Sequence, residues 1–395
     1  MEHCDHLDEQ WISDFHAAFG DNGIIIMAWW LMTLFAEQIR SRYQDWPFME
    51  LTGLPGTGKS TLLRFMWRCC GRMDDYEGLD PNKGSQVGRA RNFERYSNLP
   101  IVLIEGDRSE KDGFKKKSFD FNELKDFYNG GIIRTTGAYT GGNETREPQF
   151  KGGVLIAQND SVHSDDDAVM ERIVHCYSTK VHHRKGTREI AKRMARLKGN
   201  ELGGWLHRAL IQEKAILEMF TDKLQNISHE WHNRDHSIRD RIVENHAKVA
   251  AGVWCLQKLF PGYMNDDTCQ QLERVVWDMA GARERRIKSD SELVTQFWEY
   301  FEFLNYRDVE DYDGSRVVTE TLNHSSNPDF IAINLQEFEV AVANNRMERL
   351  LNKELKKQLP SCISHPFDGA RNVKSQILGR GKTKFCWVFK REPNR

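Results

Sequence analysis

A glycine-rich run near the N-terminus constrains the fold of this chain more than any other feature. It consists of Gly53, Leu54, Pro55, Gly56, Thr57, Gly58, Lys59, Ser60 and Thr61. Residues 48–52 before it, three of which are large and apolar, predict a short buried strand, and the pattern of residues 60–70 after it predicts a helix. Glycines let successive backbone N–H groups converge on phosphate oxygens, and a helix beginning there adds its positive dipole end. The run therefore predicts a phosphate-binding loop.

Two side chains of the run indicate a nucleoside triphosphate. Lys59 is expected to reach the β- and γ-phosphates, and the hydroxyl of Ser60 to ligate Mg²⁺. An accidental match to this pattern arises in roughly one chain in a hundred of this length, and the strand-loop-helix context makes it rarer. We therefore predict ATP and Mg²⁺ as the cofactors.

Composition restricts the partners. The net charge is −2, with 39% hydrophobic and 29% charged residues, which argues against a surface that coats nucleic acid everywhere. Residues 371–395 are an exception, with eight Lys and Arg against one acid. The longest apolar run, residues 24–35, is too short to span a bilayer, so no membrane is expected. The eight cysteines form no C-x-x-C pair, which favours reduced thiols and a cytoplasmic location.

Further aliphatic runs predict the rest of the fold. Residues 101–104, 154–157 and 172–177 resemble strands covered on both faces, and predicted helices separate them. This alternation favours a parallel α/β sheet.

Four parts are predicted along the chain. They are an N-terminal helical region (1–45), an α/β P-loop core (46–180), an α-helical region (181–325) and a basic, winged-helix-like domain (326–395). The last is expected to run strand, two helices and a basic hairpin.

Acids follow the strand at residues 101–104. A P-loop ATPase needs a carboxylate at the end of a neighbouring buried strand, to hold Mg²⁺ through water or to orient the attacking water. Glu105 and Asp107 both qualify: either Glu105 acts on the metal and its water with the help of Asp107, or the reverse. The alternative is that these acids merely cap a strand.

Two more polar residues stand at strand ends. Asn159 follows the strand at residues 154–157 and could position the attacking water, although Asn is also common in plain turns. Arg172 precedes the next strand and could stabilise negative charge at a phosphate, although any surface arginine looks alike locally. Arg188, Arg193 and Arg196 are weaker candidates for the same role.

The motifs occur in an informative order: GLPGTGKST, IVLIEGD, NGGIIRTTGAYTGGNETREPQFKGGVLIAQND and ERIVHCYSTK. This succession resembles the AAA+ helicase region of phage and mobile-element primase-helicases, which are related to superfamily III viral helicases. The resemblance covers residues 45–180 well and the flanks in outline. It implies a hexameric ring that hydrolyses ATP to move on single-stranded or forked DNA, in a bacterial cell or a phage-infected host.

The resemblance also implies residue roles. Asn159 would be the sensor and Arg172 the arginine that reaches the neighbouring subunit. Residues 132–150 would form a hairpin in the ring's channel, the alternative being an ordinary surface hairpin. Its candidate DNA contacts are Arg134, Tyr139, Arg146 and Lys151.

Two departures from the family stand out. The acidic motif is E-G-D, and no primase module is evident, so a primase could be joined upstream or recruited.

The basic C-terminal segment resembles a winged helix. Residues 348–358 would be its recognition helix, and the wing would carry Lys374, Arg380, Lys382 and Lys384. Winged helices also dock proteins, so that alternative stays open.

Two other functions fit the glycine-rich loop. A non-motor AAA+ loader or switch would bind ATP without unwinding DNA. A small-molecule kinase would share the loop, but it would carry a lid in place of a strand-end Asn, a distal Arg and a basic C-terminal module.

Overall fold

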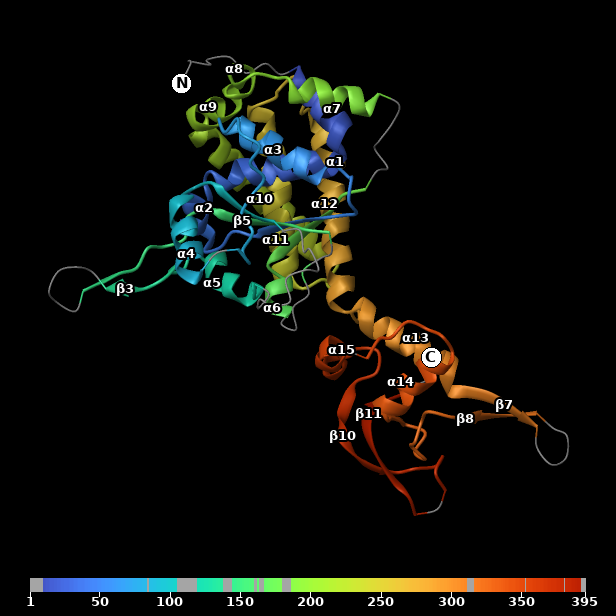
Figure 1. The fold of residues 1–395 in the computed structure, drawn as a ribbon. Helices are drawn as coiled ribbons and strands as arrows, with labels where there is room; N and C mark the ends of the chain where they lie inside the picture. Colours follow the sequence, from blue (N-terminus) through green and yellow to red (C-terminus); the bar gives the residue numbers. More distant parts are fainter. Residues whose placement is uncertain are drawn as a thin grey trace. The chain divides into compact units, whose positions relative to one another are not determined.

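The computed structural model describes most of the chain and divides it into two compact units, Met1–Glu284 and Arg285–Arg395 (Figure 1). The described residues are 10–83, 85–104, 119–137, 144–159, 162, 167–179, 186–310, 316–351, 353–379 and 381–391, with the side chains of 292, 307–310 and 316–318 left aside.

The N-terminal unit is built on a parallel sheet of four strands in the order β2–β5–β1–β6. Their bounds are Phe48–Thr52 for β1, Pro100–Ile104 for β2, Gly153–Ala157 for β5 and Ile173–Tyr177 for β6. Every residue of β1 and β5 is buried, as expected for a parallel sheet covered on both faces. The predicted α/β class is confirmed, and the strand before the glycine-rich loop lies between β5 and β6.

A short extension at the β2 edge was not predicted. Leu79 forms a parallel bridge with Leu103, and its backbone exchanges hydrogen bonds of 2.7 and 2.9 Å with Val102 and Ile104. The surrounding residues 73–95 are polar, so their pattern carries no strand signal.

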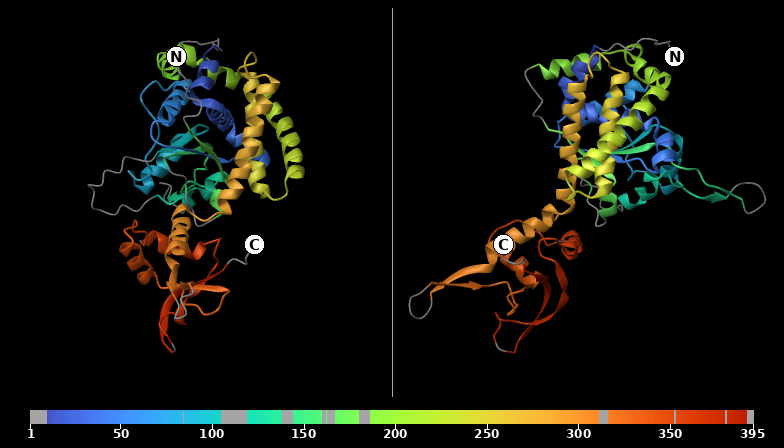
Figure 2. Two further views of the ribbon diagram at one scale, coloured as in Figure 1. Left: turned by 90° about the vertical axis from the view of Figure 1, so that its right-hand side faces the viewer. Right: turned by 180° about the vertical axis from the view of Figure 1, so that it is seen from behind.

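Helices surround this sheet. They are α1 (Trp11–Thr33), α2 (Ala36–Tyr43), α3 (Lys59–Cys69), α4 (Gln86–Arg95), the 3₁₀ turn η1 (Phe121–Leu124), α5 (Lys125–Tyr128), α6 (Asp167–Met170), α7 (Thr187–Ala195), α8 (Gly199–Leu202), α9 (Gly204–Ile211), α10 (Glu213–Arg234), α11 (Asp240–Cys255), η2 (Leu256–Lys258) and α12 (Asp266–Ile287). A separate hairpin pairs β3 (Thr136–Gly137) with β4 (Thr145–Arg146), and Figures 1 and 2 show it leaving the body of the unit.

The predicted N-terminal helical region contains two helices set at an angle. The backbone of α1 breaks at Gly20, where φ is 64° and ψ −169°. Helix α1 ends at Thr33, and α2 follows at an angle of 78°. No single helix in the described part of the chain is long and apolar enough to cross a membrane; α1 and α2 meet that test only as this bent pair.

The predicted boundaries at residues 45 and 180 separate no compact units. Helix α1 packs against α7 and α11, and the hydroxyl of Tyr128 donates to Asn245 Oδ1 of α11 over 2.7 Å. The long helices α10, α11 and α12 also pack together, with Trp231 against Trp277 and Trp254 bonded to Glu273 (Figure 2). The helical region therefore shares one core with the sheet.

The C-terminal unit has an antiparallel sheet in the order β10–β11–β9. Its elements are α13 (Glu292–Asn305), the hairpin strands β7 (Tyr306–Glu310) and β8 (Arg316–Glu320), β9 (Phe330–Ile333), α14 (Leu335–Asn344), α15 (Lys353–Gln358), η3 (Leu359–Ser361), β10 (Phe367–Lys374) and β11 (Thr383–Lys390). The predicted order of strand, two helices and hairpin is present from β9 onward.

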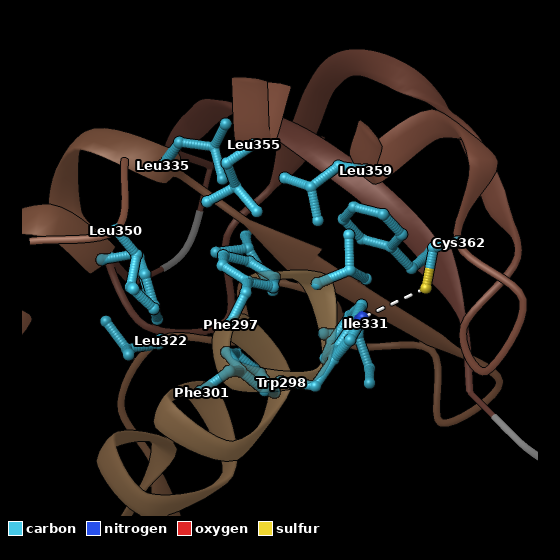
Figure 3. Close-up of a cluster of buried hydrophobic side chains, with 14 of the residues drawn as sticks. Phe297, Trp298, Phe301, Leu322, Ile331, Leu335, Leu350, Leu355, Leu359 and Cys362 are labelled. Carbon is cyan, nitrogen blue, oxygen red and sulfur yellow. Dashed lines mark hydrogen bonds between the residues drawn. The ribbon is translucent and has the colours of Figure 1, made fainter. Parts of the chain in front are cut away.

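The C-terminal unit begins earlier than residue 326. Phe297, Trp298 and Phe301 of α13 are buried in its core, and Trp298 donates a hydrogen bond of 3.1 Å to the Cys362 sulfur (Figure 3). Helix α13 therefore belongs to the core of this unit, whereas its apolar pattern alone had placed it with the preceding helices.

The predicted recognition helix, residues 348–358, is too long. Helix α15 begins only at Lys353. Leu350 and Leu355 enter the same core although five residues of separation do not fit one helical face, and residues 348–351 are not helical.

Candidate nucleotide-binding site

The glycine-rich loop joins β1 to α3, as predicted. Gly53, Gly56 and Gly58 adopt positive φ angles of 144°, 79° and 95°. A Cβ atom on Gly53 would lie 2.3 Å from the carbonyl oxygen of Ser178, so no other residue fits there. Helix α3 begins at Lys59, directly after the loop. The backbone thus has the form that a phosphate cradle requires.

Lys59 lies at the centre of the site. Its ammonium group donates to the carbonyl of Gly53, to that of Leu54 over 3.3 Å and to Asn159 Oδ1 over 3.1 Å. The contact with Asn159 joins two residues that the sequence singled out a hundred positions apart. A cation and an amide are therefore together at the mouth of the loop.

The neighbouring strands hold the loop from both sides. On the β5 side, the N–H of Gly53 donates to the carbonyl of Asn159 over 3.3 Å. On the β6 side, Ser178 donates its N–H to Thr52 over 2.7 Å and its hydroxyl to the Thr57 carbonyl over 3.3 Å. Sequence reasoning missed Ser178; its only signal was its position directly after the last predicted strand.

The N-terminal helix also reaches this edge of the sheet. Asn22, just after the break in α1, donates from its amide to the carbonyl of Tyr177 over 2.7 Å. Nothing local in the sequence assigns Asn22 to the site, because the partner is far away in the chain.

The residues present fit a nucleoside triphosphate with Mg²⁺. Ser60 and Thr61 are exposed in the first turn of α3, so their hydroxyls are accessible beside Lys59. Thr57 instead is buried, and its hydroxyl donates to the carbonyl of Leu54 over 2.9 Å. The loop therefore offers a cation, free hydroxyls and glycine backbone to one ligand.

The predicted carboxylates, Glu105 and Asp107, both lie outside the described residues. The strand before them, β2, ends at Ile104 and pairs with β5, so its carboxyl end is at the same edge as the loop. Among the residues that are described, no group of three or more His, Cys, Asp or Glu side chains could hold a metal ion.

Arg172 lies at the other end of the strands, where β1 begins. Its carbonyl accepts the N–H of Phe48, where β1 begins, over 2.9 Å, whereas the glycine-rich loop follows the other end of β1. Its guanidinium donates to the carbonyl of Ala168 and lies 5.1 Å from the centre of the Tyr128 ring. The structure does not bring Arg172 to the loop of its own chain, and a role across a subunit boundary stays a prediction.

Charged residues that the sequence did not single out gather next to Arg172. Arg239 contacts Asp167 at 2.9 Å and Glu171 at 3.0 Å, and Arg241 contacts the second oxygen of Glu171 at 2.9 Å. These ion pairs connect the start of α11 to the segment before β6.

The predicted hairpin exists, and its cations have acidic partners. Arg134 lies 3.8 Å from Glu94 of α4, and Arg146 forms an ion pair with the same carboxylate while its side chain stays 66% exposed. Lys151 pairs with Glu37 at 2.9 Å. Tyr139, the predicted aromatic contact, lies outside the described residues.

The lysines of the predicted wing in the C-terminal unit differ from one another. Lys374 and Lys382 are exposed, but Lys384 contacts Glu337 at 2.5 Å. Nε2 of His324 donates a hydrogen bond of 2.6 Å to the other oxygen of the same carboxylate. Although partial burial acts to raise it, hydrogen bonds from Lys384 and His324 hold the pKa of Glu337 below its ordinary value. Arg380 lies outside the described residues.

No protein-family model and no curated protein matches the chain. Among solved structures, the chain is similar to one titled "SCCmec type IV Cch - active helicase", at a TM-score of 0.52 and 13% identity, over 98% of this chain and 70% of that one. The chain shares its fold with a helicase. A second match, to the JCV helicase, has a TM-score of 0.25 and 14% identity over 58% of this chain and 66% of that one, which is too weak to carry an argument.

Proposed function

We propose that this chain is an ATP-dependent DNA helicase motor of the AAA+ type. The observation that carries the proposal is the contact of Lys59 with Asn159 at a glycine-rich loop held between β5 and β6. A lysine there can stabilise phosphate charge, and an amide beside it can orient a water molecule. The fold shared with a helicase supports this assignment.

Different residues would bind the phosphates, hold Mg²⁺ and orient the attacking water. Gly56 and Gly58 would supply backbone N–H groups to the phosphates, Lys59 would supply positive charge, and Ser60 would hold Mg²⁺ together with Glu105. When bound, Mg²⁺ would neutralise charge that develops on the phosphate oxygens. Asn159 and one of the two acids, Glu105 or Asp107, would direct the attacking water.

The oligomeric part of the proposal is a hexameric ring moving on single-stranded or forked DNA during replication of a phage or mobile element. Arg172 lies away from the loop of its own chain, as a residue serving a neighbouring subunit's nucleotide must. The β3–β4 hairpin leaves the body of the unit (Figure 1), which suits a loop that contacts DNA in the channel, and Arg134 and Arg146 would supply its cations.

The C-terminal unit is proposed to be a winged-helix-like DNA contact. Its order of elements and its exposed cations, Lys374 and Lys382, support this role. A primase module would be joined or recruited to such a motor.

Strand displacement from a forked DNA substrate tests the function. The wild-type protein should release the labelled strand with ATP, and Lys59→Ala should not, whereas Lys214→Ala, an exposed lysine in α10, serves as a matched control. Hydrolysis of ATP without displacement would instead identify a loader or switch, and phosphate transfer to a small molecule would identify a kinase.

A further inference from the structure

Glu50 is a buried acid in the strand that leads into the glycine-rich loop. It lies in the middle of β1, opposite Ile156 of β5 and His175 of β6, and its side chain has no exposed surface. Burying a carboxylate is unfavourable unless charged or hydrogen-bonding partners compensate for the lost water. The proposed nucleotide site does not use this residue directly.

Two partners from distant parts of the chain bind its two oxygens. Arg283, near the end of α12, donates from Nη2 to Oε2 over 3.0 Å, and both side chains are fully buried. The backbone N–H of Val162 donates to Oε1. Arg283 therefore compensates the charge and orients the carboxylate, and the second oxygen holds the backbone of Val162.

The backbone that Glu50 holds is the one that presents Asn159. The carbonyl of Asn159 accepts the N–H of Gly53, and three residues later Val162 is buried and bonded to Glu50. The chain after β5 is thus fastened to β1 at Asn159 itself and again beyond it. These two attachments restrict how the Asn159 amide approaches Lys59.

We propose that Glu50 is a positioning residue for Asn159 and that Arg283 compensates its buried charge. The proposal rests on the proposed function, because it assigns Glu50 an effect on ATP hydrolysis. Glu50 acts through Val162 and Asn159 and not on the substrate. Loosening this support displaces the amide from the water it must orient, so the rate of the chemical step falls more than the affinity for ATP.

The experiment compares three double variants by kcat, KM for ATP and melting temperature. Glu50→Leu with Arg283→Met removes the ion pair and the acceptor for Val162 together, a replacement that avoids leaving one buried charge alone. Glu50→Gln with Arg283→Met removes the charges but keeps an acceptor oxygen. Asp45→Asn with Lys248→Met removes another ion pair of the same unit, which joins the segment before β1 to α11.

The expected loss of kcat for the Leu/Met variant is roughly tenfold, as for one lost hydrogen bond, with KM changed less than about twofold. The Gln/Met variant and the Asp45/Lys248 control should stay near wild type. Added to Asn159→Ala, the Leu/Met change should cause no further loss, because residues that act through one group are not additive. Wild-type kcat in a folded Leu/Met variant, or losses that multiply with Asn159→Ala, would overturn the proposal.

A second variant covers the case in which the Leu/Met protein does not fold. Val162→Pro deletes the donor N–H and leaves Glu50 and Arg283 in place, so it should give the same roughly tenfold loss of kcat. Wild-type kcat in a folded Val162→Pro protein overturns the inference, as does a large loss in the Gln/Met variant. If the wild-type protein hydrolyses no ATP, the proposed function fails together with the inference. If the wild-type protein hydrolyses ATP and Asn159→Ala slows hydrolysis, but neither the Leu/Met variant nor Val162→Pro slows it, this inference alone fails.

Discussion

The edge of the sheet that carries the glycine-rich loop, here called the nucleotide edge, and the candidate DNA-contacting surfaces differ in the partners that their cations bind. At the nucleotide edge, Lys59 contacts an amide and two carbonyls, and the loop is fastened to strands on both sides. On the β3–β4 hairpin, Arg134 and Arg146 share the carboxylate of Glu94. A phosphate that binds Lys59 replaces neutral partners. A phosphate that binds Arg134 or Arg146 must displace the carboxylate of Glu94.

This difference predicts fixed geometry for ATP hydrolysis at the nucleotide edge and exchangeable partners for DNA binding at the other surfaces. Changes at the nucleotide edge should alter turnover by large factors, because the geometry there admits few substitutes. Changes at the hairpin and the wing should alter DNA affinity by small factors that depend on salt.

Lys59→Ala should have the largest effect. Loss of the ammonium group removes charge stabilisation at the phosphates, so ATP hydrolysis should fall by roughly 10²-fold or more. Steady-state phosphate release measures this. Activity near wild type would show that the glycine-rich loop takes no part in ATP hydrolysis, and the two regions would then not differ in the way described.

Arg172→Ala should come next, with roughly 10²-fold slower hydrolysis, as for removal of one donor to developing charge, and unchanged nucleotide binding. Mixing this variant with a Glu105 variant should partly restore activity if Arg172 serves the neighbouring subunit. If mixed protein stays inactive and nucleotide binding is lost as well, Arg172 supports only its own chain, where it packs on Tyr128.

The wing lysines should affect binding and not chemistry. Replacing both Lys374 and Lys382 by Ala should weaken DNA binding by roughly tenfold at low salt, and should flatten its salt dependence. Lys384→Ala should weaken it less, because Glu337 already holds that ammonium group. Fluorescence anisotropy across a salt series measures both; equal effects would contradict the distinction drawn between these lysines.

Glu94→Gln should give the smallest change and in the opposite direction. Releasing Arg134 and Arg146 from the carboxylate should tighten DNA binding by roughly two- to fivefold, the range of a surface ion pair. Glu144→Gln, an exposed acid on the same hairpin, is the matched control. Unchanged affinity in Glu94→Gln would show that the hairpin arginines do not contact DNA.

The sequence predicts the local parts of this molecule better than its long-range contacts. The strand, loop and helix around Lys59 follow from residues adjacent in the chain, and so do β5 and β6. The meeting of Lys59 with Asn159 was predicted only through the order of the motifs. Glu94, Glu337 and Ser178 were missed because the partners of each lie far away in the chain, where spacing carries no signal.

The sequence could not place the boundary of the C-terminal unit for a related reason. An apolar helical stripe shows that a helix is buried but not against what, so α13 was assigned to the preceding helices although it packs beneath β9 and β11. The buried Glu50–Arg283 pair was equally invisible, since neither residue stands in a motif.

ATP hydrolysis by wild type and Asn159→Ala, with and without single-stranded DNA, tests most directly whether Lys59 and Asn159 act together. We expect DNA to stimulate the wild-type rate, and we expect Asn159→Ala to bind ATP as wild type does but to hydrolyse it slowly under both conditions. A wild-type hydrolysis rate in Asn159→Ala would contradict the claim that Lys59 and Asn159 form one catalytic site.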